Sequence, residues 1–200
     1  MNPYYKIAII IPLILLAGCF GKSEVSTQYY LIEPPAKTGN SNYPENFSDK
    51  YCEISRVEIF PAYSSYKIAN SNNSNSISYY RDHQWAVLPE EMLTHTLISF
   101  FEESSVFKGV SNRFSKIKPD YRIAVIVNKM DVLEDDGKFM ARLGLSLKLH
   151  DYNTMEVISE KKKISLTELD KKNLDLFAEA ISIMFYDELE TWAKEFAAIR

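Results

Sequence analysis

Residues 139–150 read FMARLGLSLKLH, and this stretch decides the predicted fold. Apolar residues at every second position from Phe139 to Leu149 alternate with the polar Arg142, Ser146 and Lys148. Successive side chains of a strand point to opposite sides of the sheet, so this period of two predicts a strand with one buried face.

The sequence on both sides of this strand predicts a meander. Residues 121–132 form an earlier strand that is apolar on both faces over 123–127, as in the centre of a sheet. Asp135-Asp136-Gly137 predicts a tight hairpin turn between the two strands. Residues 151–154 turn the chain again, so we expect a third strand over 155–166.

Two segments have helical periodicity. A helix is expected from Pro89 to near Ser104, because proline suits the first helical position and acidic residues follow it. The second is a long helix over 170–199, with apolar residues three or four positions apart. Its length predicts that it crosses the whole sheet or contributes to an oligomer contact.

Shorter strands are expected before the first helix. One covers 29–32 and ends before two prolines, and a second covers 53–63. A hairpin has predicted arms at 66–68 and 77–80, joined by an Asn/Ser-rich tip at 70–76. The order of elements predicts an α+β fold, a mixed α/β sandwich. It has a mainly antiparallel sheet covered on one face by two helices.

The first 19 residues have the layout of a signal peptide. One lysine, an apolar run over 7–15 and small residues precede Cys19. Polar residues follow too soon for a membrane-spanning helix of about 20 residues. Leu16-Ala17-Gly18-Cys19 resembles the lipobox of bacterial lipoproteins, in which the cysteine is lipidated; an ordinary signal peptide is the alternative.

The predicted organisation is a signal peptide at 1–18, a lipidated tether at 19–28 and one domain over 29–200. The lipobox resemblance implies a diacylglyceryl group on Cys19 and an amide-linked acyl chain such as palmitate. Stable anchoring needs two such signals. By the same resemblance, Phe20 rather than aspartate after the cysteine favours the periplasmic face of the outer membrane.

Composition supports a packed domain and excludes several functions. Apolar residues make up 46% of the chain, enough for a core. Removing the signal peptide leaves 22 basic and 27 acidic residues, a net charge of −5 that gives no reason to expect a nucleic-acid partner. With Cys19 lipidated, Cys52 is unpaired, and we expect a buried small residue rather than a reactive thiol.

Catalytic and cofactor motifs are not found in the sequence. The three histidines lie in different predicted elements, and glycines form no phosphate-binding pattern, so no metal or cofactor is expected. Asp82, His83 and Glu90 are the best candidates for an acid–base cluster. We favour the alternative, in which Trp85 anchors the hairpin onto the first helix and the charged residues are solvated.

Several segments resemble the ABC-type transport auxiliary lipoprotein family, the PqiC-like proteins. Tyr29-Tyr30-Leu31-Ile32 is similar to the family's early strand, and Tyr63 lies in its Pro…Tyr strand. Residues 85–89, from Trp85 to Pro89, resemble the Trp-Ala-Glu-Pro-Leu segment that opens a helix, with the usual Glu missing and the Pro shifted. The Arg-Pro-Gln-Ile-like signature is largely lost at 66–69.

The resemblance implies a non-enzymatic role. Family members work with MCE proteins that bridge the periplasm and with an ABC permease and ATPase, guiding lipid transfer between membranes. We therefore predict a docking lipoprotein of such a system, with a homo-oligomeric ring as an expected assembly. A periplasm-facing lipoprotein that binds lipid alone and an envelope hydrolase are the alternatives.

Overall fold

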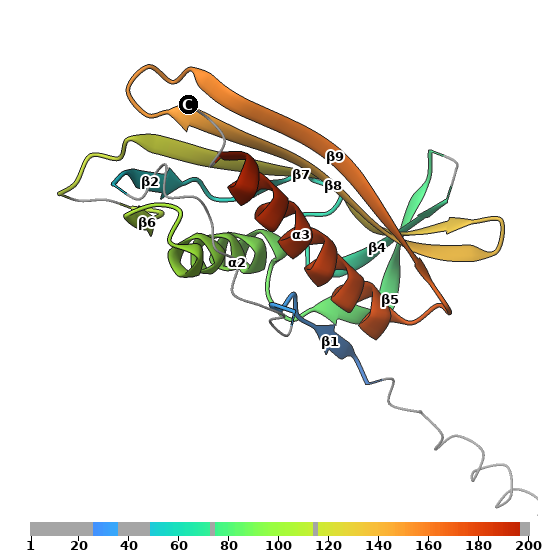
Figure 1. Cartoon of the computed structure of the whole chain (residues 1–200). Coiled ribbons are helices and arrows are strands. Elements are labelled where there is room, and N and C mark those ends of the chain that lie inside the picture. The colour runs from blue at the N-terminus through green and yellow to red at the C-terminus, as the bar shows by residue number, and fades with distance from the viewer. Residues whose placement is uncertain (1–25, 36–48, 73–74, 114–115, 197–200) are drawn as a thin grey trace, which may run out of the picture.

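The computed structural model describes residues 26–35, 49–72, 75–113 and 116–196 (Figure 1). The strands and helices, in chain order, are β1 (Gln28–Tyr30), β2 (Tyr51–Ile54), β3 (Glu58–Ile59), β4 (Lys67–Asn72), β5 (Ile77–Trp85), α2 (Pro89–Ser104), β6 (Gly109–Ser111), β7 (Tyr121–Asp135), β8 (Lys138–Asp151), β9 (Val157–Leu169) and α3 (Leu174–Phe196).

Strand β7 is the centre of the sheet. It pairs antiparallel with β8 along one side, and β8 pairs antiparallel with β9. Along its other side three short strands, β2, β3 and β4, follow one another in parallel. The longest ladders are the two antiparallel ones, so the predicted α+β fold with a mainly antiparallel sheet is confirmed.

The predicted hairpins are also confirmed. Asp136 and Gly137 have φ angles of 46° and 76°, as the two central residues of a type I′ turn require. They join paired residues Asp135 and Lys138. Strands β4 and β5 form the other hairpin. The structure extends both arms beyond the predicted ranges.

The single strand predicted over 53–63 is wrong. The structure has two short strands, β2 and β3, because the chain leaves the sheet between them. There the backbone N–H of Val57 donates to Thr94 Oγ1 of α2 at 2.9 Å rather than to a strand. Arg56 points to Glu90 and Glu91 of the same helix, at 3.6 and 3.7 Å.

Other boundaries differ by a few residues. Strand β9 begins after Met155, which has a φ of 61° and belongs to the turn. Helix α3 begins at Leu174 rather than at 170, because Asn173 caps it: Asn173 Oδ1 accepts a hydrogen bond from the N–H of Asp175 at 2.8 Å. Residues 197–200 lie outside the described residues.

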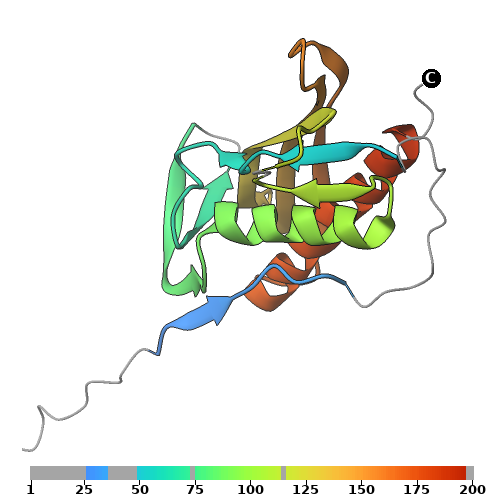
Figure 2. The ribbon, with the colours of Figure 1, turned by 90° about the vertical axis from the view of Figure 1, so that its left-hand side faces the viewer.

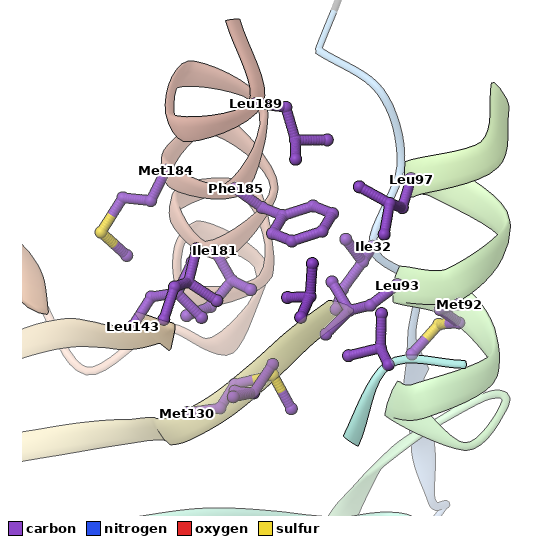
Figure 3. Packing of buried hydrophobic residues seen from close by; sticks show 14 of the residues in the cluster. Ile32, Met92, Leu93, Leu97, Met130, Leu143, Ile181, Met184, Phe185 and Leu189 are labelled. Carbon is purple, nitrogen blue, oxygen red and sulfur yellow. The ribbon is translucent and has the colours of Figure 1, made fainter. Parts of the chain in front are cut away.

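Both helices pack on the same face of the sheet (Figures 1 and 2). Leu143 and Met130 point from the strands toward Ile181 and Phe185 of α3, and Leu93 of α2 closes the layer from the other side (Figure 3). The two helices also contact each other through aromatic side chains. These rings are Phe100 with Tyr186, and Phe101 with Trp192 and Phe196.

Candidate functional site

A groove lies between β1 and the first half of α3. The backbone N–H of Glu33 donates to Ser182 Oγ at 3.2 Å, which holds the segment after β1 against the helix. The hollow beside this contact has a volume of about 480 Å³. Because β1 starts nine positions after Cys19, the groove lies close to the point where the chain would leave a lipid anchor.

The lining of this groove is apolar and acidic. Tyr29, Leu31 and Ile183 are 64%, 46% and 40% exposed, which is high for large apolar side chains. Among the described residues, the charged side chains that line it are Glu33, Asp175 and Glu179. We call these six residues the β1–α3 groove.

The wall of the groove is fixed by Tyr30. Its side chain is buried, and its hydroxyl lies 2.8 Å from His83 Nδ1 and donates to Gln28 Oε1 at 2.9 Å. Burial, with a smaller contribution from the Asp175 charge, raises the pKa of Tyr30. The hydroxyl is therefore protonated at neutral pH and serves as a structural hydrogen-bonding group.

A separate polar cluster lies on the face of the sheet that is turned away from the two helices. Asp131 is fully buried and accepts two hydrogen bonds from Arg142, at 2.8 Å from Nε and 2.6 Å from Nη2. Ser71 donates to the same carboxylate at 2.5 Å. Tyr63, also buried, interacts with Arg142, and burial raises the pKa of its phenol. These four residues are mutually satisfied, which fits a structural role.

The acid–base candidates have separate partners. His83 contacts Tyr30 and the ring of Tyr80. Glu90 contacts Ser64 Oγ and Arg56, at 3.3 and 3.6 Å. The acid–base cluster, considered and disfavoured from the sequence, is therefore divided between two groups of contacts, and no described interaction joins His83 to Glu90.

The described residues offer neither a membrane span nor a clustered metal site. Within 26–35, 49–72, 75–113 and 116–196, no helix is long and apolar enough to cross a bilayer. Over the same ranges, no three His, Cys, Asp or Glu side chains gather in a way that would hold a metal ion.

Comparison with protein families gives a match over residues 29–174, to the family described as ABC-type transport auxiliary lipoprotein component. The chain belongs to this family. The match extends from β1 to the start of α3, so it includes Tyr29, Leu31 and Glu33 of the β1–α3 groove and ends before the three groove residues of α3.

Solved structures support the fold of this auxiliary lipoprotein. A protein from Xanthomonas campestris is 17% identical with a TM-score of 0.67, over 84% of this chain and 92% of that one. A second, uncharacterised protein is 12% identical with a TM-score of 0.67, over 86% of this chain and 99% of that one. At these identities the likeness concerns the fold alone. None of the curated protein sequences compared matches the chain.

The residues on which the family resemblance was based lie partly in the core and partly at the surface of the auxiliary lipoprotein. Trp85 is buried and its ring lies 5.8 Å from that of Phe177, so it packs on α3, whereas the sequence predicted packing on the first helix. Pro89 is buried at the first position of α2. Tyr29 faces solvent at the groove. Cys19, the expected lipidation site, lies outside the described residues.

Sequence reasoning missed the groove and the Asp131–Arg142 pair. An arginine inside the alternating strand was visible, as was an aspartate in an apolar run. Their pairing depends on the register between β7 and β8, in which Asp131 lies directly opposite Arg142. The groove depends on contact between residues 149 positions apart, Glu33 and Ser182.

Proposed function

We propose that this protein is the membrane-anchored docking component of an ABC/MCE-type intermembrane lipid transport system. The family match over residues 29–174 is the observation that supports it most. That family is an auxiliary component of ABC-type transport, and the MCE partner and lipid cargo are the specific part of our proposal.

Two features of the structure favour docking to a partner over binding of a lipid in a cavity between the sheet and the helices. The space between the sheet and the helices is filled by buried side chains, among them Met130, Leu143 and Phe185 (Figure 3). The β1–α3 groove and a second hollow, lined by residues of β9 and α3, both open at the surface along α3. A surface that contacts a partner agrees better with this arrangement.

The proposed anchor is a lipid on Cys19, with no other cofactor. Cys19 would be the first mature residue, held at the periplasmic face of the outer membrane as Phe20 favours. The partners are an MCE protein and, through it, the ABC permease and ATPase. We also propose that several copies form a ring, because a lipid conduit needs a closed path.

The test is co-purification of the full-length lipoprotein from detergent-solubilised envelopes. We expect an MCE protein to accompany it, with a known envelope complex recovered in parallel as a positive control. A Cys19→Ser variant is the matched control, because it keeps the folded domain and removes the proposed anchor. Recovery of bound lipid without any transport component would contradict the proposal and favour a lipid-binding protein that acts alone.

A second measurement tests the membrane assignment. We expect the wild type in the outer-membrane fraction of a density gradient and Phe20→Asp in the inner-membrane fraction. An unchanged distribution of Phe20→Asp would show that residue 20 does not determine the location.

A further inference from the structure

The β1–α3 groove combines exposed apolar side chains with carboxylates for which the described part of the chain supplies no basic partner. Asp175, Glu179 and Ile183 are spaced four residues apart, so they form one line along the exposed side of α3. Glu33 faces this line from the segment after β1. Among the described residues, no lysine or arginine forms an ion pair with Glu33, Asp175 or Glu179.

A second hollow continues the same surface on the other side of α3. Its volume is about 210 Å³, and it shares Glu179 and Ile183 with the groove. Its further charged residues are Glu168 and Asp170, at the end of β9 and just after it. Lys138 pairs with Glu168 there, at 3.2 Å. Both hollows are thus lined by acidic and apolar side chains, on either side of one helix.

The acidic and apolar side chains of the groove indicate which kind of ligand it would bind. Carboxylates beside exposed aliphatic and aromatic groups complement a segment that carries Lys or Arg next to apolar side chains. The phosphate of a lipid headgroup would be repelled by the same carboxylates. A peptide segment of a partner protein fits better than a lipid.

The short chain between Cys19 and β1 limits how far the domain can lie from the membrane. Residues 19 to 28 span at most about 30 Å when fully extended, at roughly 3.3–3.6 Å per residue. With Cys19 in the membrane, Gln28 at the start of β1 stays within that distance of the bilayer. The partner segment must therefore reach the tethered side of the domain.

We infer that the β1–α3 groove binds a basic amphipathic segment of the MCE partner. This inference rests on the proposed function and adds the surface and the chemistry of the contact. Leu31 and Ile183 receive the apolar side chains of the segment, and Glu33, Asp175 and Glu179 pair with its Lys or Arg residues.

Binding of variants to an MCE protein from the same organism tests the inference. The full-length lipoprotein is kept in detergent, and affinity is measured at low and high salt. We expect Asp175→Lys with Glu179→Lys to weaken binding at least tenfold, and Ile183→Glu to do the same. Glu102→Lys is the control for charge reversal, because it reverses a single acidic side chain at an exposed position of α2, away from the groove. It should change affinity less than twofold.

A photo-reactive amino acid at position 183 identifies the contact directly. We expect a cross-link to an MCE peptide that contains Lys or Arg beside apolar residues. Cross-linking to phospholipid, or to a second copy of this chain, would overturn the inference.

The outcomes separate the two proposals. If the wild type and the groove variants bind the MCE protein equally, the inference is wrong and the proposed function stands. If the wild type binds no MCE protein either in this assay or in co-purification, both are wrong.

Discussion

Arg142 Nη2 lies 2.6 Å from Asp131 Oδ2, and the Asp131 side chain is completely buried. The two residues face each other across β7 and β8, and Ser71 adds a hydrogen bond from β4. The hydrogen bonds with Asp131 raise the pKa of Arg142. One ion pair therefore joins three strands on the face of the sheet that is opposite the helices.

Arg142→Ala should be among the most destabilising single changes on that face. It leaves the Asp131 carboxylate buried without its partner, a change that costs about 3 kcal/mol or more in the free energy of unfolding. Urea unfolding followed by tryptophan fluorescence measures this. Lys138→Ala breaks an exposed pair with Glu168 and should cost less than about 1 kcal/mol.

The double variant Asp131→Leu with Arg142→Met separates two explanations. Replacing both charges by apolar groups of similar size removes the unpaired carboxylate, so stability should recover well above that of Arg142→Ala. A double variant as unstable as the single one would mean that the pair itself, rather than the cost of an unpaired charge, stabilises the sheet.

Trp85→Ala should destabilise the domain by about 3–5 kcal/mol. The Trp85 side chain is 1% exposed and packs on Phe177, so truncation leaves a large cavity in the core. Thermal unfolding followed by circular dichroism provides the measurement. Tyr29→Ala is the control from the same family motif, and because Tyr29 is 64% exposed we expect a change below about 1 kcal/mol. Similar losses for the two variants would contradict the structural role given to Trp85.

The elements predictable from sequence are those whose signals are local. The alternation of Leu143, Leu145 and Leu147 is sufficient to predict β8 and its buried face. Pro89 and two glutamates mark the start of α2 correctly. The Asp136-Gly137 turn determines the pairing of β7 with β8, because its backbone geometry admits few other connections.

Features that depend on distant contacts were not predictable. The chain leaves the sheet at Val57 because Thr94, 37 residues later, accepts its N–H. The parallel pairing of β1 with β5 joins Tyr30 to Trp85, and no local pattern indicates this. The β1–α3 groove forms only when β1 is paired with β5 and the first half of α3 lies beside it. Periodicity predicted the buried stripe of α3 but not what lies beside its exposed side.

Cys52 should make stability fall at alkaline pH. Burial raises the pKa of its thiol far above the usual value, so the thiol stays neutral in the folded protein. In the unfolded chain it ionises near pH 8.5. Its contribution to stability is therefore complete below that pH and declines above it, by about 1.4 kcal/mol per pH unit.

Urea unfolding at pH 8 and pH 10 tests this sign. The loss between the two pH values should be smaller in Cys52→Ala than in the wild type, by about 2 kcal/mol. Burial raises the pKa of Tyr80 to about 12, whereas its pKa in the unfolded chain is 10. The Tyr80 phenol therefore makes stability depend on pH mainly above pH 10, and it does so equally in both proteins. An identical decline in both proteins would show that Cys52 ionises in the folded state or does not affect stability.

Glu188 should matter more to stability than Glu195, although both face lysines of β9. Glu188 is 3% exposed and pairs with Lys163, and its other oxygen lies 3.9 Å from Lys161. Glu195 pairs with Lys161 at 2.9 Å, but its side chain is 49% exposed. We expect Glu188→Gln to lower the free energy of unfolding by about 1–2 kcal/mol, since it removes a charged hydrogen bond to a buried carboxylate, although Lys163 itself is half exposed. Glu195→Gln should cost less than about 0.5 kcal/mol.

Salt provides the independent check on the Glu188 prediction. Salt screens partly buried pairs much less than exposed ones, so most of the cost of Glu188→Gln should persist in 1 M NaCl while any cost of Glu195→Gln disappears. These contacts hold α3 against β9, and α3 also forms one wall of the groove. Glu188→Gln should therefore weaken the proposed binding of an MCE protein only at urea concentrations that begin to unfold the domain. Equal effects of the two substitutions at both salt concentrations would mean that the burial of Glu188 contributes nothing.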